Sequence, residues 1–188
     1  MNDRIERLPR WAEIGREQWT HRGARRPSFA DPVGAGQESV WDYPRPACAV
    51  ADPRRVVVQV GGVEIAATTD AIRVLETSHP PSFYLPRSSV APDALRPTTH
   101  TTRCEWKGVA TYFDVVGGDI VAACAAWSYE APFDEMAVLA GYVSFYPSRV
   151  DCFVDGHRVV PQHGGFYGGW ITPEIVGPFK GAPGTSGW

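Results

Sequence analysis

The chain has 188 residues, of which 44% are hydrophobic and 21% charged, and its formal net charge is −3. This composition is typical of a soluble globular protein with one sizeable core, and the small net charge excludes a general attraction to nucleic acid or to an anionic membrane. The longest apolar run, near residues 120–127, is too short to span a bilayer, and the opening "MNDRIERLPRW" lacks the apolar segment of a signal peptide. We therefore predict a cytoplasmic protein without nucleic-acid or membrane partners.

Residues 1–53 are predicted to form an N-terminal arm. A short amphipathic helix is expected around residues 10–19, and the stretch "HRGARRPSFADPVGAG" after it is dense in Gly, Pro and Arg, as surface segments are. Three arginines of this stretch have two interpretations, a solvated face, which we favour, and a phosphate site. They are Arg22, Arg25 and Arg26.

Residues 54–160 are predicted to form a β domain of consecutive antiparallel strands. Segments such as "RRVVVQV", "SFYL" and "VATYFDVV" are β-branched or aromatic and are bounded by turn residues. Three similar blocks, "VGGVEIA", "VGGDIVA" and "VDGHRVV", place a two-residue turn with Gly before an alternating strand, which predicts three hairpins. One short helix is expected near residues 132–140, because Pro132 and Gly141 supply its start and stop signals.

Residues 161–188 form a tail rich in Gly and Pro that nevertheless keeps several Phe, Tyr and Trp residues. Disordered segments are poor in aromatic residues, so we expect this tail to dock on the β domain.

The four cysteines carry little evidence of a metal site or of disulfides. No two of them form a C-x-x-C pair, and the chain has no secretory context. They are Cys48, Cys104, Cys124 and Cys152. We predict no metal and no cofactor.

Several blocks resemble, in the same order, the bacterial and fungal family called domain of unknown function 427. The blocks are "VLETSHPPSFYLPRSSV", "CEWKGVATYFDV", "AAWSYEAPFDEMAVLAGYVSFYPSRVDCFVDG" and "FYGGWITPEIVGPFKGAPGTSGW", with "ESVWDYPRP" as a further match. The resemblance covers about residues 56–188 and implies a small mostly-β domain similar to the β-tent of methionine sulfoxide reductase B and of Mss4-like zinc proteins.

The resemblance implies no activity. A nucleotidyltransferase-like label is sometimes attached to the family, but the chain has neither a Gly-Ser loop followed by a paired-Asp strand nor a P-loop for phosphates. The chain also lacks the two C-x-x-C knuckles through which the β-tent relatives bind zinc, which counts against zinc here.

The stretch "TRCEWKGVATYFDV" determines which residues share a face of the predicted sheet. Taking Lys107-Gly108 and Gly117-Gly118 as two-residue turns lets alternation sort three strands into two faces. The first face is almost wholly apolar and is expected to pack on the core, with its cysteines as small buried hydrophobes. Its members are Cys104, Trp106, Val109, Thr111, Phe113, Val115, Ile120, Ala122 and Cys124.

The second face places charged and aromatic side chains around a patch of alanines. This pattern fits a small-molecule pocket, or alternatively a half-exposed face covered by the tail. The candidate pocket residues on it are Glu105, Tyr112, Trp127 and Tyr129.

A second candidate block, "ETSHPPSFYLPR", is stiffened by two prolines. Its polar side chains suit the binding of a small anion or general acid–base work, and the alternative is a structural histidine that caps a turn. These side chains are Glu76, His79, Tyr84 and Arg87.

Three functions from different classes fit the sequence. The first is a small-molecule-binding β domain, with an enzyme acting on a small metabolite as one version of it. The second is a non-catalytic binding module or homodimeric assembly module that uses the arm and the tail. The third is a structural zinc protein. We rank them in this order, and the sequence assigns no catalytic residue and no substrate.

Overall fold

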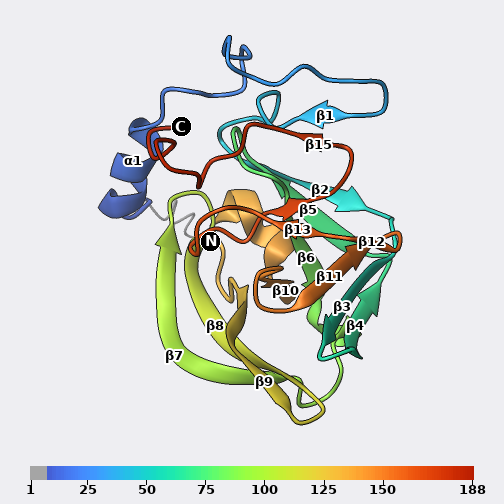
Figure 1. Ribbon diagram of the computed structural model, residues 1–188. Coiled ribbons are helices and arrows are strands. Elements are labelled where there is room, and N and C mark those ends of the chain that lie inside the picture. The colour runs from blue at the N-terminus through green and yellow to red at the C-terminus, as the bar shows by residue number, and fades with distance from the viewer. Residues whose placement is uncertain (1–7) are drawn as a thin grey trace.

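The computed structural model describes residues 8–188 and is mostly β, with two antiparallel sheets as its main elements (Figure 1). The larger sheet has seven strands, in the spatial order β2 (Cys48–Asp52), β5 (Ala71–Leu75), β6 (Ser82–Pro86), β10 (Tyr142–Phe145), β9 (Ile120–Ser128), β8 (Gly108–Gly117) and β7 (Leu95–Cys104). The smaller sheet has four, in the order β12 (His157–Arg158), β11 (Asp151–Val154), β3 (Val56–Val60) and β4 (Val63–Thr68). The prediction of a mostly-β chain of antiparallel hairpins is confirmed, whereas the β-tent resemblance stays a prediction.

The remaining elements are short. Strand β1 (Glu38–Ser39) pairs in parallel with β15 (Ile175–Val176), and β13 (Val160–Pro161) pairs with β14 (Trp170–Ile171). The helices are α1 (Arg10–Glu17), η1 (Arg87–Ser89) and η2 (Asp134–Leu139). The helix expected near residues 132–140 is therefore a 3-10 helix, with a non-helical kink inside it at Met136.

Two predicted hairpin turns are confirmed. Val60 pairs with Val63 across Gly61-Gly62, and both glycines have positive φ, as tight hairpin turns require. Val154 likewise pairs with His157 across the Asp155-Gly156 turn.

Two other turns differ from the prediction. Cys104 pairs with Gly108, so three residues, including Lys107, form the loop in place of the two-residue turn Lys107-Gly108. Gly117 pairs with Ile120, so the second turn lies one residue later than Gly117-Gly118. Because side chains alternate along a strand, one extra loop residue changes which residues share a face.

The face assignment is therefore wrong in part. Phe113 and Val115 do pack in the core between the sheets, but Cys104 and Trp106 pack against the opposite cluster together with Tyr112. Val109 and Ile120, expected to be buried, are 46% and 50% exposed. A further irregularity between Phe113 and Val115 places Cys124 beside the Tyr112 cluster as well.

Each face of the seven-stranded sheet packs against a different partner. One face packs on the four-stranded sheet, where Phe83 and Leu85 of β6 meet Val56 and Val58 of β3. The other face carries Tyr84 of β6, which lies in a cluster that includes Met136 and Leu139 of η2. The candidate site lies on this second face.

The arm and the tail pack together on the sheet. Residues 48–52, assigned to the arm in the prediction, form an edge strand of the larger sheet, and residues 1–7 of the arm lie outside the described residues. In the tail, Trp170 is fully buried, stacks on Phe83 at 4.9 Å and donates its indole hydrogen to the Phe145 carbonyl. The C-terminal end lies beside the arm (Figure 1), where the ring of Trp188 stacks on that of Phe29 at 5.0 Å.

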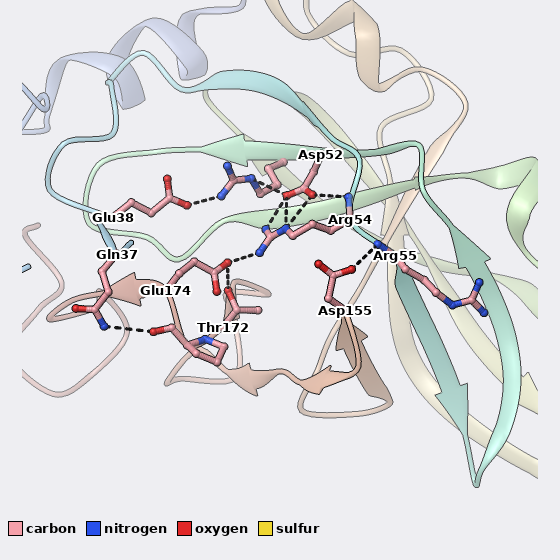
Figure 2. Close-up of polar contacts among 10 residues, drawn as sticks. Gln37, Glu38, Asp52, Arg54, Arg55, Asp155, Thr172 and Glu174 are labelled. Atoms are coloured by element: carbon pink, nitrogen blue, oxygen red, sulfur yellow. Dashed lines mark hydrogen bonds and ion pairs between the residues drawn. The ribbon is translucent and has the colours of Figure 1, made fainter. Parts of the chain in front are cut away.

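Arm, sheet and tail are also joined by ion pairs, which Figure 2 shows. Asp52, whose side chain is 3% exposed, is 2.6 Å from Arg54 and 3.0 Å from Arg73. Arg54 also pairs with Glu174 of the tail, and Arg73 pairs with Glu38 of the arm.

Among residues 8–188, no helix combines the length and the apolar character that crossing a bilayer would need.

Candidate functional site

The loop between β7 and β8 buries a lysine. The amide of Lys107 donates to the Cys104 carbonyl at 3.2 Å, and Gly108 follows with φ of 106°, a conformation that favours glycine. The Lys107 carbonyl in turn accepts from the Phe133 amide at 3.2 Å, so the segment before η2 covers the loop. Lys107 is consequently only 9% exposed.

A cavity of about 110 Å³ lies on the second face of the sheet, beside this lysine. Half of its lining residues are aromatic, Arg103 and Lys107 are the cations among the others, and residues 166–168 of the tail close one side. The lining residues that matter below are Tyr84, Cys104, Glu105, Lys107, Tyr112, Trp127, Tyr129, Tyr146 and Tyr167.

A smaller cavity of about 70 Å³ adjoins the first. The two share four lining residues, which are Ser82, Lys107, Tyr167 and Gly168. The smaller cavity adds Glu76, His79 and Gln162 to this set. Lys107 therefore stands at the boundary between an aromatic chamber and a polar one.

The carboxylates near Lys107 are already engaged by other groups. Glu76 accepts from the Trp106 indole at 3.1 Å and lies 3.3 Å from the fully buried guanidinium of Arg45. Glu105 accepts from the Trp19 indole at 2.6 Å. Within residues 8–188, no carboxylate lies within ion-pair distance of the Lys107 ammonium.

The other neighbours of Lys107 are dipoles at neutral pH. The pKa of Lys107 is raised, because burial opposes the ammonium but is outweighed by the charges that Cys104 and Tyr84 carry when ionised, by the Glu76 carboxylate and by a hydrogen bond with Cys104. Burial also raises the pKa of Cys104, and that of Tyr84 to about 12, so both keep their protons at neutral pH. At neutral pH the Glu76 carboxylate, which lies beyond ion-pair distance, is thus the negative charge that favours the ammonium, while Cys104 and Tyr84 face it as protonated groups.

The tyrosine hydroxyls divide into satisfied and free groups. Tyr146 donates to the Phe166 carbonyl at 3.1 Å, while Tyr112 lies 2.9 Å from the Thr102 hydroxyl and 3.4 Å from that of Tyr146. Tyr84 accepts from the Trp127 indole at 3.2 Å, and its own hydrogen has no acceptor among residues 8–188. The Tyr84 hydroxyl thus remains a donor.

The chain matches, over residues 48–156, the family described as Domain of unknown function (DUF427). It belongs to this family. A comparison with curated proteins returned no match. The DUF427 match includes Tyr84, Lys107, Tyr112 and Trp127, whereas residues 166–168, which close the cavity, lie beyond it.

The predicted pocket residues of this DUF427 chain fall in three places. Four of them line the larger cavity together with Tyr84: Glu105, Tyr112, Trp127 and Tyr129. Glu76 and His79 line the smaller cavity. Arg87 lines neither, because its guanidinium hydrogen-bonds Ser128 and Glu130 and packs over the Phe113 ring.

Sequence reasoning missed Lys107 as a site residue and placed it in a two-residue turn with Gly108. The available signal was Gly108, since loops longer than two residues commonly end in a glycine with positive φ. Gln162 and Tyr167 come from the tail and carry no local signal that would connect them to the sheet.

The basic arm makes local contacts. Arg26 pairs with Asp42 at 2.5 Å, and Arg22 donates to the Arg16 carbonyl at 2.9 Å.

Over residues 8–188, no group of three or more His, Cys, Asp or Glu side chains is placed to hold a metal ion.

A wider hollow of about 520 Å³ lies beside the edge strand β2. The carboxylates that line it are Asp52, which Arg54 and Arg73 neutralise, and Asp70. The hollow contains no buried charge without a partner. We therefore place the candidate site at Lys107, although the cavity there is smaller.

Proposed function

We propose that this DUF427 chain binds a small organic anion in the cavities beside Lys107. One observation carries the proposal, namely that the Lys107 ammonium is buried and meets no carboxylate within ion-pair distance in residues 8–188. A buried charge is costly unless it is paired. A ligand anion would supply the missing partner.

The shapes of the cavities support a ligand with two parts. One water-sized sphere needs roughly 10–15 Å³, so the larger cavity of about 110 Å³ has room for roughly seven to eleven and the smaller one of about 70 Å³ for roughly five to seven. The larger cavity offers aromatic walls from Tyr112, Trp127 and Tyr129, which suit a planar or apolar body. The charged end of such a ligand would lie at Lys107.

The Tyr84 hydroxyl adds a neutral donor to this arrangement, since the Trp127 indole already occupies its acceptor side. A donor beside an ammonium favours oxygen acceptors over amino groups. We assign no reaction, so the proposal concerns binding alone.

The test compares charged ligands with neutral ligands of the same shape. Thermal unfolding of the full chain is followed with benzoate against benzamide, and with acetate against acetamide. Ligand at 100 times its dissociation constant stabilises the native state by about 2.7 kcal/mol. We expect the carboxylates to raise the unfolding temperature and the amides to leave it nearly unchanged.

Lys107→Met should abolish the response to benzoate, because it removes the charge and keeps much of the apolar volume. The matched control is Arg55→Met, which removes a cation whose side chain is 62% exposed. The control should respond as the wild type does. Equal stabilisation of wild type and Lys107→Met by benzoate, or stabilisation by benzamide alone, would contradict the proposal.

A further inference from the structure

The smaller cavity contains a glutamine whose orientation is determined by its neighbours. The Gln162 Oε1 atom accepts from the Gly169 amide at 3.1 Å, and its Nε2 atom donates to the Lys180 carbonyl at 2.7 Å. An amide N–H can only donate and a carbonyl can only accept, so the two ends of the side chain cannot be exchanged. Gln162 is 5% exposed and is held in this orientation.

This orientation determines the tautomer of His79. The Gln162 Nε2 atom lies 3.1 Å from His79 Nδ1, and since Nε2 is a donor, Nδ1 must accept. Burial, together with the charges of Lys180, Arg45 and Lys107, lowers the pKa of His79 well below its usual value, so the ring is neutral. A neutral ring whose Nδ1 accepts carries its hydrogen on Nε2.

The Nε2–H group of His79 has no acceptor among residues 8–188, and His79 lines the smaller cavity together with Lys107. Two donors are therefore available there, one from a neutral ring and one from an ammonium. Glu76 also lines the cavity, but Arg45 and the Trp106 indole engage its carboxylate.

We propose that the smaller cavity is a carboxylate subsite, in which His79 Nε2–H and the Lys107 ammonium donate to the ligand while Gln162 holds the histidine in the required tautomer. This inference rests on the proposed function and names the group recognised at the same site. Two donors match the two oxygens of a carboxylate. A phosphate has more oxygens than these two donors can satisfy, so it fits less well.

Gln162 is a positioning residue in this scheme, and Gly169 is part of its support. A Cβ atom on Gly169 would lie 2.3 Å from Gln162 Oε1 and 2.9 Å from the Pro80 carbonyl oxygen, so this position admits only glycine without displacement. The close approach of the tail to the glutamine thus contributes to the geometry of the subsite.

The first measurement uses the unmodified chain. Long-range ¹H–¹⁵N correlation spectra of the histidine rings should show His79 as the neutral Nε2–H tautomer at pH 7, and benzoate should shift its Nε2–H resonance. A His79 ring protonated on Nδ1, or one whose signals benzoate leaves unmoved, overturns the inference without any substitution.

The second measurement uses variants with benzoate and inorganic phosphate as probes. His79→Phe keeps a ring beside Tyr167 and removes one donor to a charged group, so its dissociation constant for benzoate should rise about tenfold. Gln162→Met should raise it less and give a mixture of His79 tautomers in the spectra. His157→Phe, at an exposed position, should bind as the wild type does.

The outcomes separate this inference from the proposed function. Benzoate binding that requires Lys107 but is unchanged in His79→Phe overturns the subsite and leaves the proposed function standing. Absence of benzoate binding to the wild type overturns both. Phosphate binding tighter than benzoate would overturn the assignment to a carboxylate.

Discussion

Asp52 and Lys107 are both charged side chains that the fold removes from water, and their surroundings differ. Asp52 meets two guanidinium groups, Arg54 at 2.6 Å and Arg73 at 3.0 Å, and each of these pairs with a further carboxylate. Lys107 meets a thiol, a hydroxyl, the Tyr129 ring at 6.0 Å and cavity space. The first charge is neutralised within the chain, whereas the second has no carboxylate partner among residues 8–188, and we propose that a ligand supplies one.

The difference separates a buried charge that is compensated within the chain from one that is not. The Asp52 network joins segments that are far apart in the sequence, from Glu38 in the arm to Glu174 in the tail (Figure 2). Burial would raise the pKa of Asp52, but hydrogen bonds from Arg54 and the charge of Arg73 hold it below its ordinary value. In this network each charge is compensated within the chain.

The largest effect is expected from breaking the network. Asp52→Asn leaves two guanidinium groups without their shared carboxylate, and removing one member of a buried pair costs about 3 kcal/mol of unfolding free energy. Urea denaturation at pH 7 measures this loss. The control is Asp151→Asn, which breaks an exposed pair with Arg158 and should cost less than about 1 kcal/mol.

The same variant should change the acid sensitivity of the chain. Because the folded pKa of Asp52 is depressed, its contribution to stability is present above the unfolded value of about 3.9 and is lost as the pH falls through the folded pKa. Asp52→Asn should therefore be closest to the wild type in stability at the lowest pH. A constant difference at every pH would contradict the ion-pair explanation.

An intermediate effect on the unfolding free energy is expected from His79, which lines the smaller cavity with Lys107. Burial and three nearby cations keep its ring neutral in the folded chain, whereas the unfolded ring gains a proton below about pH 6.5. The stabilising contribution is thus complete above pH 6.5 and decreases as the pH falls, by up to about 1.4 kcal/mol per pH unit. Denaturation at pH 7, 6 and 5 measures the slope.

His79→Phe should reduce that slope, since phenylalanine takes up no proton. His157→Phe is the matched control, because His157 is exposed and should leave the slope unchanged. Identical slopes of unfolding free energy against pH in wild type and His79→Phe would show that the folded chain does not hold the histidine neutral. The proposed effect of the nearby cations on His79 would then be wrong.

Local turn chemistry explains which parts of the fold were predictable. Gly61-Gly62 and Asp155-Gly156 are turns whose residues adopt positive φ readily, so the sequence alone locates these hairpins. The loop at Lys107 is compatible with two or three residues by composition. Its length depends on long-range contacts, such as the Phe133 amide bonding to the Lys107 carbonyl, which a local pattern does not contain.

The grouping of residues around the cavities was predictable only in part. Alternation along the strands predicted that Tyr112, Trp127 and Tyr129 share a face, and all three line the larger cavity. Cys104 was placed on the wrong face because the extra loop residue reverses its side, and Arg87 was wrongly grouped with the histidine because its partner Glu130 lies 43 residues away. Gln162 was not considered, since only the docked tail brings it beside His79.

The smallest effect on stability is expected from Lys107→Met. No ion pair is lost within the described chain, and methionine fills much of the same volume, so the unfolding free energy at pH 7 should change by less than about 1 kcal/mol. Urea denaturation beside Asp52→Asn makes the comparison direct. A loss near 3 kcal/mol would mean that the ammonium is part of the structural framework, as Asp52 is. A small loss of unfolding free energy in Lys107→Met, combined with a complete loss of benzoate binding, would separate the two kinds of buried charge. Removing the lysine would then abolish ligand binding and leave the fold intact, whereas removing Asp52 would destabilise the fold.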